Sequence, residues 1–273
     1  MNYTALYYGW KPVIRICTGL AFASGWVRNT NWITLPTLDT GSQKFVGLLG
    51  ITNDSGNYNS VLAQGSSGYL VNWGDGTETS GYVTNTRADY LYEYGRCSGE
   101  YEFTGIAGNL MRQVIVTITP SGQGTLTDIN LQQKYPKINL QNYRSYWLDI
   151  NINGPNITSL AIGGSTIIPS WLEKININTI GNITNFTNMF YGCSSLQSIP
   201  QLNTAAGTNF TSMFYNCYSL QSIPQLNTAA GTNFTSMFYN CYSLQSIPQL
   251  NTAAGTNFTN MFYGCSSLQS IPQ

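Results

Sequence analysis

The sequence of 273 residues contains no histidine, and only 8% of its residues are charged. The absence of histidine excludes Ser-His-Asp and Cys-His catalysis, HExxH zinc sites and a histidine general base. About a quarter of the residues in an average soluble domain are charged, so this scarcity argues against an ordinary cytosolic enzyme. Eleven acidic residues balance eleven basic ones. No net charge would therefore attract nucleic acid or an anionic membrane, and we expect neither as a partner.

Long apolar runs are also missing. No stretch of about 18 apolar residues occurs, which excludes a membrane-spanning helix. Residues 1–30 form an N-terminal segment, a candidate anchor, whose apolar stretch is interrupted by Lys11, Pro12 and Arg15. It lacks the basic-then-apolar order of a secretory signal. A surface protein without such a signal would leave its cell by another export route or by lysis, as virion proteins do.

Motifs for nucleotide cofactors are absent as well: there is no Walker A sequence and no GxGxxG motif. Glycoside cleavage would need two carboxylates, and all acidic residues lie between Asp39 and Glu173. Five of them are candidates for a cluster: Asp75, Glu78, Glu93, Glu100 and Glu102. Solvated strand faces and turn caps are the ordinary roles of such residues. We expect no catalytic residue, no cofactor and no enzyme, with a polysaccharide-degrading enzyme as a remote alternative.

The sequence is rich in repetition. One unit, LQSIPQLNTAAGTNFTSMFYNCYS, recurs with a period of 24 residues along the last third of the chain, where no charged residue follows Lys174. In one copy the recurring apolar positions are Phe210, Met213, Phe214, Cys217, Leu220 and Ile223. A fixed period in the twenties predicts a solenoid, in which each unit buries its apolar face only against its neighbours. Such arrays are typical of binding surfaces and spacers.

Each unit divides into two parts. LQSIPQL reads as an extended piece, and NFTSMFYNC as a short helical or 3₁₀ turn, because its apolar residues follow the i, i+3, i+4, i+7 spacing of one helical face. Exposed Tyr, Asn and Gln suit carbohydrate, through ring stacking and amide hydrogen bonds. Tyr218 and Tyr242 occupy the same place in successive units and are our candidate binding surface. Alternatively, they only stack on each other for stability.

Four of the six cysteines occupy one repeat position: Cys193, Cys217, Cys241 and Cys265. Equivalent positions lie about one strand spacing apart with parallel Cβ vectors, which does not suit a disulfide. We predict a ladder of buried free thiols. Cys17 and Cys97 could pair, and the sequence does not decide it.

Residues 31–120 read as short strands separated by Gly, Asn, Ser and Asp, which predicts an antiparallel β-sandwich. The expected strands are GLLGI, SGYLVNW, GYVT, ADYLYEY, GEYEFTG and RQVIVTITP. The motif is Trp73, Gly74, Asp75, Gly76 and Thr77: a strand brings Trp73 to the core, and Gly-Asp-Gly forms a tight turn. With the Tyr-rich strand and the Gly-x-Tyr strand that follow, it resembles the PKD domain, an immunoglobulin-like sandwich. The resemblance implies a spacer or adhesion module. The excursion between Gly95 and Arg112 is longer than in that family.

Asp75 has two interpretations. It can cap its own turn by accepting backbone N–H bonds. It can also join Glu78 or Asp89 in a calcium site built from oxygen ligands. We expect no metal, with Asp75 and Glu78 as the weak calcium candidates.

Residues 121–170 read as connecting strands and the entry cap of the solenoid, and residues 171–273 as the 24-residue repeats. Leu148, Ile150 and Ile152 alternate as in a strand. The phrase MFYGCSSLQSIP and its copies resemble the BspA-type leucine-rich repeats of bacterial, protist and viral surface proteins. A WGDGT sandwich followed by such repeats also resembles structural proteins of tailed marine phages.

We therefore expect a mainly β protein: an immunoglobulin-like (PKD-like) sandwich followed by a leucine-rich-repeat solenoid with short helical turns. The expected function is that of a non-enzymatic virion protein, structural or receptor-binding, in a tail fibre or capsid decoration. The alternative is a bacterial cell-surface adhesin of the BspA type. Host-surface carbohydrate or protein is the expected ligand. The repeats stop at Pro272-Gln273 without a polar cap, so we expect self-association or another virion protein to cover that end.

Overall fold

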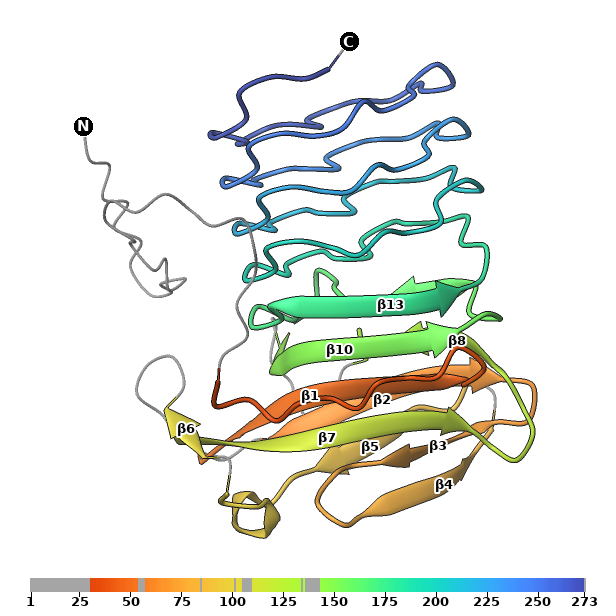
Figure 1. The fold of residues 1–273 in the computed structure, drawn as a ribbon, viewed down its shortest axis with the longest axis vertical. Coiled ribbons are helices and arrows are strands. Elements are labelled where there is room, and N and C mark those ends of the chain that lie inside the picture. Colours follow the sequence, from red (N-terminus) through yellow and green to blue (C-terminus); the bar gives the residue numbers. More distant parts are fainter. Residues whose placement is uncertain are drawn as a thin grey trace.

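The computed structural model describes residues 30–53, 57–83, 85–100, 102–104, 110–133, 135 and 143–272. The N-terminal segment expected at residues 1–30, with Cys17, lies outside them except for residue 30. The described chain is mainly β and contains no α-helix (Figure 1). In chain order its elements are β1 Lys44–Thr52, β2 Tyr58–Gly65, β3 Tyr69–Asn72, β4 Glu78–Tyr82, β5 Ala88–Leu91, the 3₁₀ turn η1 Tyr94–Arg96, β6 Phe103–Thr104, β7 Leu110–Pro120, β8 Leu126–Asn130, β9 Tyr143–Arg144, β10 Trp147–Gly154, β11 Ser159–Ala161, β12 Ile167–Ile168 and β13 Lys174–Ile180.

Two sheets share one core in the first part of the chain. The larger runs in the order β13-β10-β1-β7-β3-β4, with β6 added at β7, and the smaller in the order β11-β8-β2-β5. Inward residues of both sheets, such as Phe45, Val116, Val61 and Ile129, are fully buried in a single cluster. The expected strands around GLLGI, YLVN, ADYL and RQVIVTITP are present, whereas β2 was not anticipated. Strands β8 and β10 come from the segment assigned to connecting strands, and they pair with β2 and β1.

The WGDGT turn has the geometry expected of it. Trp73 is fully buried, and its indole N–H donates to Thr79 Oγ1 at 2.8 Å. Gly74 and Gly76 have φ values of 82° and 89°, a region that a residue without a Cβ enters at little cost. Asp75 accepts the backbone N–H of Thr77 at 3.0 Å. The motif therefore places one large aromatic ring between the sheets and reverses the chain directly after it.

An extended segment, residues 31–42, crosses the outer face of the larger sheet (red in Figure 1). Its apolar side chains pack on Val46, Leu48 and Leu148, and this second cluster explains why β1 is buried on both faces. Side-chain amides on three strands of the sheet bind its backbone: Gln113 on β7, Asn151 and Asn153 on β10, and Asn178 on β13. These bonds satisfy peptide groups that would otherwise lack partners. Neither the segment nor its position was predicted.

The pairing changes from antiparallel to parallel where the sheets meet the repeats. β10 pairs with β13 in parallel, and β8 pairs with β11 in parallel. The repeats then stack on these edges: the backbone N–H groups of Ile162 and Gly163 donate to Met189, and parallel bridges join Asn185, Asn209, Asn233 and Asn257. One buried cluster runs without a break from Phe45 to Met261. The sheets and the repeat stack therefore share one core.

The turn in each repeat is not helical, which corrects our expectation. The N–H groups of Phe210, Ser212, Phe214 and Asn216 donate to the next repeat along the stack, at 2.8–2.9 Å. The intervening N–H groups, of Met213, Tyr215 and Cys217, donate three residues back within the same turn. Ser212 and Asn216 have φ values of 53° and 59°, and a left-handed residue every fourth position interrupts any helix. Successive N–H groups therefore alternate between a hydrogen bond to the next repeat and a hydrogen bond within their own turn.

The predicted repeat core is confirmed. Phe210, Met213, Phe214, Cys217, Leu220 and Ile223 are all at most 7% exposed. Cys193, Cys217, Cys241 and Cys265 are free thiols, as predicted, and so is Cys97. The thiol of Cys217 donates to the Phe190 carbonyl in the preceding repeat at 3.1 Å. Cysteine thus fills an apolar position while supplying one weak donor to the neighbouring turn.

Candidate binding surface on the repeats

Two rows of tyrosine lie on the turn side of the repeats. The first row has one ring in each of four repeats, Tyr191, Tyr215, Tyr239 and Tyr263, and was not recognised in the sequence. Successive ring centroids lie 4.6, 4.5 and 4.7 Å apart, and the rings are nearly parallel. The recurrence of tyrosine at the 24-residue step was the available signal. In this row each inner ring has both faces covered by neighbouring rings.

The second row is the predicted pair, Tyr218 and Tyr242. Their ring centroids are 5.1 Å apart with an interplanar angle of 15°. Tyr242 is 43% exposed, against full burial of the core rings. The equivalent positions in the flanking repeats are Ser194 and Ser266, so the row is two rings long. Both predicted roles are compatible with this geometry, because the pair stacks internally and is also accessible.

The two rows lie side by side. The pKa of Tyr215 is raised, mainly by burial. The neighbouring phenols of Tyr191, Tyr239 and Tyr242 raise it further. The two tyrosine positions of a repeat are three residues apart in the same turn, Tyr215 with Tyr218 and Tyr239 with Tyr242. Between the two positions of each repeat stands Asn216 or Asn240, and Asn240 Nδ2 donates to Asn216 Oδ1 at 3.0 Å. The surface therefore combines phenol rings with amides and contains no charged group.

Two of the three calcium candidates, Asp75 and Asp89, have polar partners within the protein. Asp75 accepts the Thr77 N–H through one oxygen and the Tyr90 hydroxyl through the other, at 3.0 and 2.7 Å. Asp89 pairs with Arg87 at 2.6 Å. Within the described residues no group of three or more acidic or cysteine side chains is placed to hold a metal ion. Asp75 therefore caps its own turn by accepting the Thr77 N–H, the first of its two interpretations.

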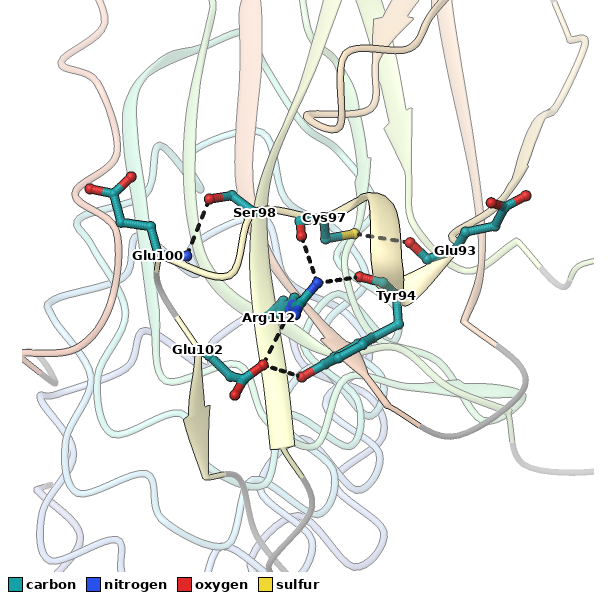
Figure 2. Close-up of polar contacts among 7 residues, drawn as sticks. All are labelled: Glu93, Tyr94, Cys97, Ser98, Glu100, Glu102 and Arg112. Atoms are coloured by element: carbon teal, nitrogen blue, oxygen red, sulfur yellow. Dashed lines mark hydrogen bonds and ion pairs between the residues drawn. The ribbon is translucent and has the colours of Figure 1, made fainter.

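Three of the other acidic candidates, Glu93, Glu100 and Glu102, lie around η1 (Figure 2). Glu93 pairs with Arg96 at 2.9 Å on the surface, and Glu78 lies on β4. Figure 2 shows the carboxylates of Glu93 and Glu100 pointing away from each other, on opposite sides of the turn. No hydrogen bond among the described residues joins two of the five acidic candidates for glycoside cleavage.

Arg112 of β7 organises this region, a role that the sequence did not reveal. Its guanidinium donates to the carbonyls of Tyr94 and Cys97, each at 2.9 Å, and lies 4.4 Å from the centroid of the Tyr94 ring. It also bonds Glu102 at 3.2 Å, and Glu102 accepts the Tyr94 hydroxyl at 2.7 Å. The Tyr94 and Arg112 bonds lower the pKa of Glu102. Arg112 thus fixes the described part of the long excursion between Gly95 and β7.

The last described repeat exposes apolar side chains whose counterparts in the preceding repeats are buried. Phe258 is 41% exposed, whereas Phe210 and Phe234, which have the same position, are fully buried. Ile271 is 52% exposed. No helix among the described residues has the length and apolar character to cross a membrane.

Comparison with known proteins matches part of the chain to a protein family. Residues 167–272 are similar to a family described as "Mycoplasma protein of unknown function, DUF285". This span begins in β12 and includes all four full repeats. No curated protein and no solved structure matches the chain.

Proposed function

We propose that this protein is a non-enzymatic virion component, structural or receptor-binding, of a tail fibre or capsid decoration. The β-sheet part is a PKD-like, immunoglobulin-like spacer, and the stacked repeats are a solenoid of the BspA leucine-rich-repeat type that provides the adhesion or assembly surface. The observation that carries the proposal is the uncharged tyrosine and asparagine surface on a stack that shares its core with both sheets. Such a stack presents a fixed surface at the end of a rigid spacer.

Assembly is the second part of the proposal. The exposed Phe258 face would bury its apolar rings against a second copy or another virion protein. Apolar patches of this kind are typical of interaction sites. The experiment is sedimentation velocity of the full chain and of Phe258→Ser, over a range of concentrations. We expect the natural chain to associate and the variant to remain monomeric; a natural chain that is monomeric throughout contradicts this part.

One observation favours the alternative of a bacterial cell-surface adhesin: the matching family is named after Mycoplasma, a bacterium. The two proposals differ in where the protein is found. Antibodies against the chain should label virions in electron micrographs if the virion proposal is right. Labelling of intact bacterial surfaces in the absence of virions would establish the alternative instead.

Receptor binding is tested with the purified protein and intact cells. A fluorescent conjugate of the full chain should bind host cells saturably, and unlabelled protein should compete. Absence of saturable binding to any host tested contradicts a receptor-binding role and leaves the structural role.

A further inference from the structure

A small cavity lies between the two sheets, beside the connection from β1 to β2. Its walls come from the end of β1, the start of β2, Tyr92 and the residues just before β10. The space inside is about that of one water molecule. None of the described residues that line it is charged. An ion would therefore lack a counter-charge, and the cavity suits a small neutral molecule.

Two polar side chains of this cavity are buried without a partner. Asn59 and Ser145 are each 4% exposed, and both line the cavity. Neither Asn59 Nδ2 nor Ser145 Oγ has a hydrogen-bond partner among the residues that the structure describes. Buried polar atoms of native proteins are nearly always bonded to another protein group or to ordered water. Two such atoms around one cavity therefore indicate a bound molecule.

Strand β2 directs Asn59 towards the cavity. Val61 and Ala63 of β2 are buried in the shared core, and Asn59 lies on the same face of the strand because side chains alternate. Asn57 also lines the cavity, but its carboxamide accepts the Thr52 N–H at 2.9 Å and donates to the Thr52 carbonyl at 2.7 Å. Of the two asparagines, Asn59 is therefore the one whose amide donor is available to a bound molecule.

We propose that this cavity binds one ordered water molecule, which accepts a hydrogen bond from Asn59 Nδ2 and donates one to Ser145 Oγ. Buried waters bind polar groups of this kind, which would otherwise be unsatisfied. Asn59 belongs to the smaller sheet, and Ser145 lies two residues before β10 of the larger sheet. The water thus links the two sheets next to the strand that pairs with β13. This site is independent of the proposed virion function.

The sign of two stability changes tests the water link. Ser145→Ala and Asn59→Leu each remove one partner of the water, so each should lower the melting temperature of the full chain by about 2–4 °C. Without a bound water, each substitution would instead remove a buried polar group that lacks a partner, and the melting temperature would rise. A rise or no change in either variant overturns the proposal. Ser145→Ala removes a single oxygen atom and decides the matter if Asn59→Leu does not fold.

The double variant separates a shared water from two unrelated effects. Its melting temperature should fall by less than the sum of the two single shifts, because the second substitution removes a group that the first has already left unpaired. Additive shifts overturn the link. Ser222→Ala is the control, since Ser222 is exposed, and its melting temperature should be that of the natural chain.

A high-resolution crystal structure of the full chain tests the water directly. We expect one water peak within hydrogen-bonding distance, about 2.7–3.2 Å, of both Asn59 Nδ2 and Ser145 Oγ. The same peak should be weaker or absent in Ser145→Ala. A natural chain with no peak at this position, with a protein group bonded there instead, or with a peak that refines as an ion overturns the proposal.

Discussion

The side-chain amide of Asn153 in β10 donates to the carbonyl of Asp39, 114 residues earlier in the chain, at 2.9 Å. The same nitrogen also lies within bonding distance of the carbonyls of Thr40 and Ser42, at 3.1 and 2.5 Å. Asn153 is fully buried. One side chain thus holds the end of the segment 31–42 against the strand that leads into the repeats.

Replacing Asn153 by Ala should lower the free energy of unfolding by about 2 to 3 kcal/mol, because three carbonyls lose the donor that a fully buried side chain supplies. Urea unfolding followed by tryptophan fluorescence measures the change. Asn178→Ala is the control, since Asn178 donates one bond to the same segment, at 3.2 Å, and we expect a loss of about 1 kcal/mol or less. Equal losses in the two variants would contradict the special role of Asn153.

The left-handed residue in each repeat turn offers a substitution that should increase stability. Ser212 and Ser236 have φ values of 53°, and Asn188 and Asn260 occupy the same position in the flanking repeats at 57° and 56°. Asparagine tolerates this conformation better than other residues with a side chain. Ser236→Asn should therefore raise the free energy of unfolding by about 0.5 kcal/mol, and Ser236→Ala should lower it by about 1 kcal/mol.

Ser222→Asn is the control for the two Ser236 variants, because Ser222 is exposed and is not among the residues with positive φ. Its stability should stay within experimental error of the natural chain. Thermal melts of all three variants at one pH decide the matter. An unchanged melting temperature in both Ser236 variants would show that the turn conformation does not limit stability.

In this turn the buried positions could be predicted from the sequence, but the backbone conformation could not. The buried positions of the repeat, from Phe210 to Ile223, could be predicted because a strict period leaves only one face to bury. The helical assignment was wrong because the i, i+3, i+4, i+7 spacing of Phe210, Met213, Phe214 and Cys217 is also produced by two successive tight turns. The distinguishing signal was the presence of Asn or Gly at positions 188, 192, 260 and 264, residue types that accept positive φ.

Other features depend on contacts that no local pattern encodes. Segment 31–42 has no strand or helix period, and its place is set by Asn153 and Gln113, more than 70 residues away in the chain. The hydrogen bonds from Arg112 to the carbonyls of Tyr94 and Cys97 likewise join residues that are distant in the sequence. For the candidate surface, Tyr218 and Tyr242 were found because they recur. The adjacent four-ring row was missed although it recurs more regularly.

The buried thiols predict a loss of stability in alkaline solution. Burial raises the pKa of Cys217 well above its ordinary value of 9.0. Below pH 9.0 both folded and unfolded chains keep this proton. Above it the unfolded chain loses the proton and the folded chain does not, so the free energy of unfolding falls as the pH rises. Between about pH 8 and about pH 10, Cys217 should account for a fall of about 1.4 kcal/mol.

Denaturant unfolding of the natural chain and of Cys217→Ala at these two pH values measures that share. The variant should be less stable than the natural chain at both pH values. Its free energy of unfolding should, however, fall by about 1.4 kcal/mol less between the two pH values than that of the natural chain. Leu220→Ala, which truncates a fully buried neighbour without a titrating group, should lower stability and keep the full pH difference. The same pH difference in Cys217→Ala as in the natural chain would show that this thiol does not titrate on unfolding.

The Arg112 contacts predict a local effect without a change in the repeats. Arg112→Lys keeps the charge but cannot bond two carbonyls and a carboxylate while covering the Tyr94 ring, because an ammonium group lacks the planar fork of a guanidinium. Hydrogen exchange measured by mass spectrometry should become faster in residues 94–97, where the N–H groups of Arg96 and Cys97 donate within the turn. Peptides from residues 185–250 should keep their protection. Arg96→Lys is the control, because the Arg96–Glu93 pair is two-thirds exposed on both sides and such pairs contribute little. If protection of residues 94–97 survives in Arg112→Lys, or if Arg96→Lys loses it equally, the turn is held by something other than the guanidinium of Arg112.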